Sequence, residues 1–138
     1  MLRPGGIVGV RDPDVGTGLL IPTTPLMEQL RALRARVHQH NVGHTFVPSH
    51  HRRLLLEAGF ERAEAGASVE AAGSLEETRR TAAWLEDQHR GLARTALAEG
   101  WVNEGEIDAM SAEIKAWGER PDAFSATIWC EAIGWVGN

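Results

Sequence analysis

Strand-type and helix-type hydrophobic patterns alternate along this 138-residue chain, and this alternation limits its fold more than any other feature. A short apolar run at Ile7–Val10 follows a Pro-Gly-Gly turn, and a run of period two begins at Arg62. A third stretch, Phe124–Trp135, is rich in aromatic and β-branched residues. Helical periodicity fills the intervals between these runs. Interleaved strands and helices predict an α/β protein.

The first interval carries the signals of two helices. Thr24 followed by Pro25 is a typical helix start, and apolar residues at helical spacing continue from there to about His40. We expect Ser49 to cap a second, short helix and Gly59 to end it in the left-handed conformation.

The segment between the second and third strand patterns, at about 74–118, has the sequence signals of two longer helices. Ser74 with Glu77 and Asn103 with Glu106 each form a capping-box pattern. His89 lies on the apolar stripe of the first of these helices, so a core histidine is favoured over a functional one.

The strands differ in the burial that their patterns predict. Alternate small apolar residues from Ala63 to Ala71 indicate a strand with one wet face, suited to a position at or near the sheet edge. The last stretch is apolar on both faces, so we expect neighbours on both sides of it. We expect Ile7–Val10 to be a buried strand that Pro13 and its neighbours end.

Composition excludes several classes of protein. The net charge of −5 argues against a nucleic-acid partner, which needs a basic surface. One cysteine, Cys130, excludes an internal disulfide and a zinc site with several cysteines. No apolar run approaches the roughly 20 residues of a membrane helix, and no signal peptide is recognisable, so we expect a single cytoplasmic domain over residues 1–138 without a membrane partner.

Two short motifs resemble a known family. Leu2-Arg3-Pro4-Gly5-Gly6 before an apolar strand resembles the turn into the fifth sheet strand of class I S-adenosylmethionine-dependent methyltransferases. Glu57-Ala58-Gly59-Phe60 resembles the junction that enters the sixth strand of that family. The order of elements over nearly the whole chain is similar to the C-terminal half of the menaquinone and ubiquinone methyltransferase-like group (methyltransferase-11).

The resemblance implies a partial Rossmann-like sheet made of the last three strands of the family, with a helical insert at about 74–118. The final strand would run antiparallel between the other two. In the family, S-adenosylmethionine is held by a glycine-rich loop and an acidic residue in the half that precedes this one. Neither Gly5-Gly6 nor Gly16-Thr17-Gly18 has the strand-loop-helix context of that loop. We therefore expect the chain alone to bind no cofactor and to be inactive as a methyltransferase.

The resemblance also places the acceptor pocket at the loop after the first strand and the helices beyond it. The substrate-pocket candidates are Arg11, Asp12, Asp14, His38, His40 and Asn41. A carboxylate or imidazole there can accept a proton from an acceptor atom. Turn capping is the alternative interpretation for the two aspartates, which flank Pro13. The spacing of the six histidines does not favour a metal site.

Two functions stay open at this point. The first is a methyltransferase-family protein that acts on a small molecule and needs its other half. The second is a small-molecule binding pseudo-enzyme, or a repurposed cyclase or isomerase, that uses the retained pocket. Because Ile7–Val10 would lack its neighbour in the family sheet, we also expect a homodimer through that exposed edge or through swapped helices.

Overall fold

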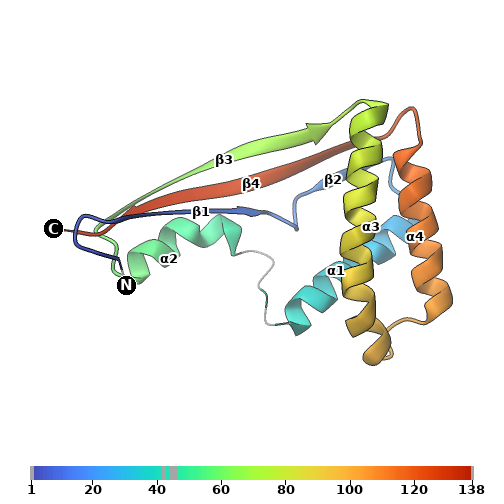
Figure 1. Cartoon of the computed structure of the whole chain (residues 1–138), viewed down its shortest axis with the longest axis horizontal. Coiled ribbons are helices and arrows are strands. Elements are labelled where there is room, and N and C mark those ends of the chain that lie inside the picture. The colour runs from blue at the N-terminus through green and yellow to red at the C-terminus, as the bar shows by residue number, and fades with distance from the viewer. Residues whose placement is uncertain (1, 42, 44–46, 138) are drawn as a thin grey trace. The chain divides into compact units, whose positions relative to one another are not determined.

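The computed structural model describes residues 2–41, 43 and 47–137. The chain forms two compact units (Figure 1). The first contains residues 1–18, 44–70 and 127–138, and the second contains residues 19–43 and 71–126. Helices and antiparallel strands occur together, so the predicted α/β class is confirmed.

The sheet of the first unit has the final strand at its centre. β4 (Phe124–Trp135) pairs with β1 (Ile7–Pro13) on one side and with β3 (Arg62–Ala72) on the other, as Figure 1 shows. β1 and β4 are antiparallel, with Ile7 opposite Trp135 and Pro13 opposite Trp129. The prediction of neighbours on both sides of the last strand is therefore confirmed.

β1 differs from the buried strand that its sequence predicts. It is seven residues long and continues through Pro13, because proline at the last position removes no N–H that the pairing needs. Ile7 is 60% exposed, whereas Val8 and Val10 are partly buried. The strand therefore has one covered face and one open face.

The covered face packs against α2 (His51–Glu57), which follows a 3-10 turn, η1 (Pro48–His50). Leu55 of α2 forms a small core with Ala63 and Ala132. The predicted cap at Ser49 is wrong, because α2 begins at His51, after that turn. Gly59 ends the helix with φ +91°, as predicted.

β3 forms over the predicted residues, but its burial does not alternate as the sequence predicts. Ala63 and Ala72 are buried at its two ends. Between them Ala65 and Ala67 are exposed, and Val69 is 66% exposed. Since α2 is only seven residues long, its core reaches Ala63 alone on this strand.

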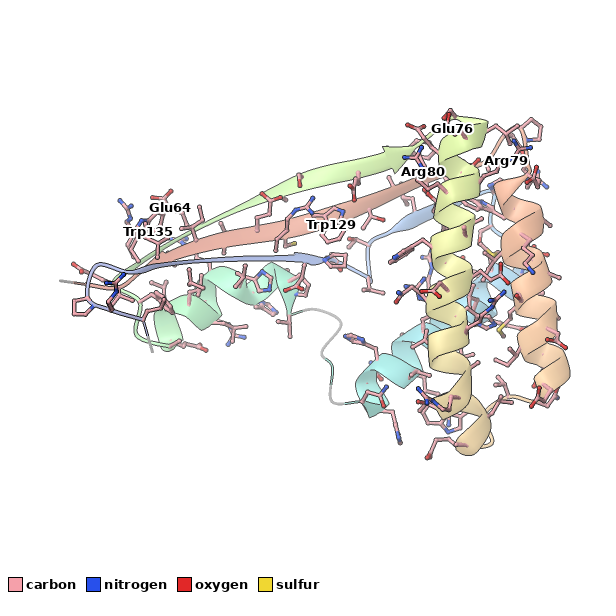
Figure 2. All side chains as sticks on the ribbon, viewed as in Figure 1. Glu64, Glu76, Arg79, Arg80, Trp129 and Trp135 are labelled. Atoms are coloured by element: carbon pink, nitrogen blue, oxygen red, sulfur yellow. The ribbon has the colours of Figure 1, made fainter. Side chains whose placement is uncertain are left out.

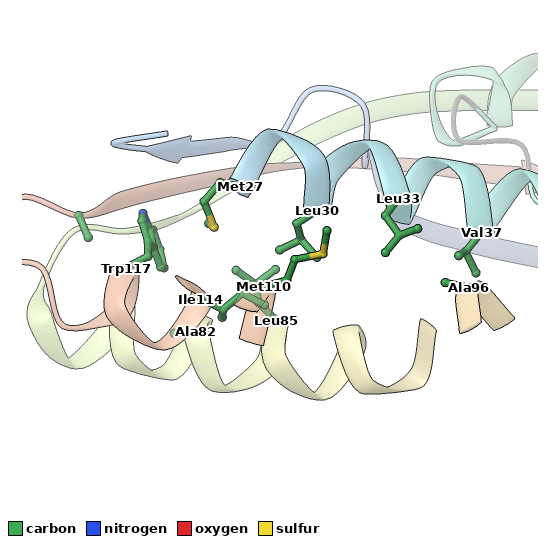
Figure 3. Close-up of a cluster of buried hydrophobic side chains, with 11 residues drawn as sticks. Met27, Leu30, Leu33, Val37, Ala82, Leu85, Ala96, Met110, Ile114 and Trp117 are labelled. Atoms are coloured by element: carbon green, nitrogen blue, oxygen red, sulfur yellow. The ribbon is translucent and has the colours of Figure 1, made fainter. Parts of the chain in front are cut away.

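The second unit packs three helices around one apolar core. These are α1 (Pro25–His40), α3 (Leu75–Ala98) and α4 (Glu104–Gly118), and their predicted caps at Thr24, Ser74 and Asn103 are all present. Figure 3 shows α1 placing Met27, Leu30, Leu33 and Val37 against the side chains of the other two helices. Ile114 and Val37 have no exposed surface.

A fourth strand, β2 (Leu19–Ile21), was not predicted from the sequence. It pairs with Ala126, Ser125 and Phe124 at the start of β4. The indole nitrogen of Trp117 donates to the carbonyl of Ile21 at 3.1 Å. Pairing and this side-chain bond stabilise the short segment that follows Gly16 and Gly18.

Candidate functional site

Asp12 and His51 meet on the covered face of the first unit's sheet. Asp12 stands near the end of β1 and His51 at the first position of α2. The Nε2 atom of His51 lies 3.0 Å from Oδ2 of Asp12. Because a carboxylate only accepts, the contact is favourable when Nε2 carries a proton.

The two partners differ in their access to solvent. The side chain of His51 is 7% exposed, and its Nδ1 atom is buried without a hydrogen-bond partner among the described residues. The side chain of Asp12 is 58% exposed. The imidazole is therefore fixed within the fold, and the carboxylate that it contacts faces solvent. This arrangement suits a carboxylate base positioned by a histidine.

Asp14 has a structural place in the turn after β1. Its Oδ1 accepts from the backbone N–H of Gly16 at 3.0 Å, and its own N–H donates to the carbonyl of Ile128 at 2.8 Å. Burial, and then the nearby charge of Asp14, raise the pKa of the Cys130 thiol. The geometry of Asp14 is that of the turn-capping carboxylate considered from the sequence.

Arg11 projects from the other face of the sheet, because successive side chains of a strand alternate. Its Nε donates to Glu131 Oε1 at 2.9 Å, and its guanidinium lies 4.1 Å from the ring centroid of Trp129. Ser68 donates to the same carboxylate oxygen at 2.8 Å. These two donors, Ser68 first, lower the pKa of Glu131. Figure 2 labels Trp129 and Trp135, which lie on β4.

The remaining three candidates belong to the second unit. Asn41 is the C-cap of α1, and His38 and His40 lie in the last turn. His40 contacts the ring of Trp101 edge-on, with 5.3 Å between the centroids, and its Nε2 is 3.9 Å from Glu99. The guanidinium of Arg36 lies 3.9 Å from the centre of the same indole ring.

The six predicted pocket residues are thus divided among different surroundings. Asp12 lies on one face of a strand and Arg11 on the other, while His38, His40 and Asn41 fall in the other unit. Sequence reasoning missed His51, whose contact with Asp12 spans distant parts of the chain. Its only sequence signal is its place in the first turn of a short helix after the strand.

A shallow groove of about 290 Å³ lies along α3 and α4 in the second unit. Ala82, Ala83 and Gly118 form its apolar lining. The charged lining residues pair with one another: Arg79 with Glu119 at 2.7 Å, and Glu86 with Lys115 at 3.0 Å. The charged side chains of the groove therefore serve as contacts between α3 and α4.

His89 is fully buried in the same unit. Its Nε2 contacts the carbonyl oxygen of Ile107 at 3.1 Å, in agreement with the core interpretation of this residue. Within the described ranges, no group of three or more His, Cys, Asp or Glu side chains has a metal-binding arrangement.

The two glycine turns considered from the sequence, at Gly5-Gly6 and Gly16-Thr17-Gly18, lack the geometry of a nucleotide-binding loop. Gly5, with φ +72°, precedes β1, and Gly16 lies in the turn before β2. Both turns lead into strands, so neither directs a helix N-terminus at a ligand as a dinucleotide-binding loop does.

Comparison of the chain with protein-family models and with curated proteins finds no match. None of the helices in the described part of the chain is both long and apolar enough to cross a membrane.

Proposed function

We propose that this chain forms the acceptor side of a class I S-adenosylmethionine-dependent methyltransferase that acts on a small molecule. One observation carries the proposal. β4 runs antiparallel to β1 and lies between β1 and β3, with Asp12 near the end of β1. This is the order that the sequence resemblance implies for the last three strands of the family.

Asp12 is the proton-accepting group in this proposal. Its exposed carboxylate is suited to take a proton from an oxygen, nitrogen or carbon of the acceptor. His51 is a positioning residue, because its buried ring contacts one carboxylate oxygen. Arg11 does not share this role, since it lies on the opposite face of β1.

In the family that the chain resembles, the cofactor is held by the half that precedes this one, so the proposal includes a second half, encoded in the same gene or as a separate polypeptide. We expect the 138-residue chain alone to be inactive as a methyltransferase. The reading frame before Met1 and the adjacent genes test this directly. A strand, glycine-rich loop and helix encoded there would support the proposal, and their absence from both would contradict it.

The role of Asp12 is tested in the protein assembled from both halves. Asp12→Asn should lower kcat while the Kd of S-adenosylhomocysteine stays the same. Asp14→Asn is the matched control, because its amide oxygen can still accept from Gly16 in the turn. Equal effects of the two substitutions on kcat would argue against Asp12 as the base.

A second candidate function is supported by the same pair of residues. Asp12 and His51 lie within one unit, and proton transfer by a carboxylate requires no cofactor. A small-molecule binding protein, or a cyclase or isomerase, would use them directly. Calorimetric titration of the chain with apolar metabolites separates the two functions, because binding without any cofactor half favours the second.

The proposal includes a cytoplasmic location and, for the chain without its second half, self-association. Ile7 and Gly9 are exposed on β1, which pairs with β4 but with no strand on its other side among the described residues. Unpaired edges of apolar strands tend to pair with another strand. Light scattering after size-exclusion chromatography tests whether the chain is a dimer.

A further inference from the structure

The backbone groups that point outward from β1 can be assigned from its bonds to β4. Val136 donates to the carbonyl of Gly6 at one end of the pairing, and Asp14 donates to the carbonyl of Ile128 at the other. In an antiparallel pair, hydrogen-bonded residues alternate with residues whose N–H and C=O groups point away. The even-numbered residues of β1 therefore bond to β4, and the odd-numbered residues point outward.

The outward groups form a short and well-defined edge. Ile7, Gly9 and Arg11 each present one N–H and one C=O, and all three are exposed. Pro13 presents only a carbonyl, so the donor row ends before it. Gly9, in the middle of this edge, has no side chain, and a Cβ added there would meet nothing within 4 Å, so the face of the strand is open at this position.

We propose that β1 pairs antiparallel with β1 of a second copy of this chain, about a two-fold axis at Gly9. This inference rests on the self-association included in the proposed function and specifies its register. Gly9 would face Gly9 of the second copy, and Ile7 would face Arg11 of the second copy on either side of the axis. Each of these pairs exchanges both backbone hydrogen bonds, so every outward N–H of the edge has an acceptor.

Side chains favour this register over its neighbours. Val8 would face Val10 of the second copy, which places two partly buried apolar residues together. A register centred on Arg11 sets two guanidinium groups against each other. A register centred on Val10 sets Ile7 against Pro13, which has no N–H to donate. Only the Gly9-centred register avoids both conflicts and uses all three outward residues.

Opposite charges at position 7 test the register. In the proposed dimer, Ile7→Glu faces Arg11 of the second copy and should tighten the dimer, whereas Ile7→Lys faces the same cation and should weaken it. Each pair occurs twice across the axis, so the two Kd values should differ about tenfold or more at low salt, and less at high salt. Sedimentation equilibrium measures these values.

Val69→Glu and Val69→Lys provide the matched control, because Val69 is similarly exposed but lies on β3. We expect the Val69 pair to leave the Kd unchanged, and thermal unfolding at low concentration to show each variant folded. A dimer whose Kd shifts in the same direction with both Ile7 variants would overturn the register. If the wild-type chain were monomeric at every concentration, the proposed pairing of β1 with a second copy would be wrong. The proposed methyltransferase function would not be affected by that result, because it is tested separately by the binding of S-adenosylhomocysteine.

Discussion

The Nε2 atom of His51 lies 3.0 Å from the Oδ2 atom of Asp12, and this contact ties the first turn of α2 to the end of β1. It joins a buried ring to an exposed carboxylate. The pair therefore holds the short helix on the sheet and at the same time fixes the carboxylate that we propose accepts a proton.

A double-mutant cycle on this pair should give a coupling free energy of about 1 kcal/mol, measured by urea unfolding of Asp12→Ala, His51→Ala and the double variant. His51→Ala should cost more than Asp12→Ala, because the ring is buried. The exposed pair Arg53–Glu57 is the control, with an expected coupling of about 0.3 kcal/mol. No coupling between Asp12 and His51 would contradict the positioning role.

Substitution of two glycines of the helical unit by alanine should change the free energy of unfolding in opposite directions. An added Cβ at Gly118 would lie 2.5 Å from the Cβ of Ala82, so Gly118→Ala should destabilise the α3–α4 contact by about 1–3 kcal/mol. Gly91 lies within α3 with nothing within 4 Å of an added Cβ. Gly91→Ala should stabilise the protein by about 0.5–1 kcal/mol. Chemical denaturation distinguishes the two, and a stabilising Gly118→Ala would show that the helices are less closely packed.

Glu86 should make the stability of the helical unit depend on pH in acid. Its contacts, first with Lys115 and then with Arg90, lower the pKa of its carboxyl from an ordinary value of 4.5 to about 2. A carboxylate with a lowered pKa in the folded state stabilises the fold above pH 4.5, and this contribution is lost as pH falls towards 2. Glu86→Gln should therefore flatten the decline of Tm over that range.

Glu76→Gln provides the comparison for this measurement. It also removes a carboxylate from α3, but from an exposed pair with Arg80 (Figure 2). Its Tm curve should run parallel to that of the wild type. If Glu86→Gln also ran parallel, the cluster of Glu86, Lys115 and Arg90 would contribute no acid-dependent stability.

The sequence was most informative where structure is local. Caps at Thr24, Ser74 and Asn103 depend on residues three or four positions apart, and all were predictable. The central place of β4 followed from its apolar character on both faces. β2 was not predictable, because pairing with β4 and the Trp117 bond stabilise it from distant parts of the chain.

The candidate site was only partly predictable for the same reason. Asp12 was selected from its place after an apolar strand, but nothing local indicates His51 as its partner. The alternation of β strands does predict that Arg11 and Asp12 project to opposite faces. The sequence of β3 does not predict how much of the strand is covered. Coverage depends on the length of α2, and this helix is too short to cover Ala65, Ala67 and Val69.

Binding of S-adenosylhomocysteine tests the central proposal most directly. Isothermal titration calorimetry should detect no binding to the 138-residue chain alone, and binding with a micromolar Kd once the chain is combined with its cofactor half. Asp12→Asn should leave that Kd unchanged. Micromolar binding by the 138-residue chain alone, or no binding by the combined protein, would contradict the account.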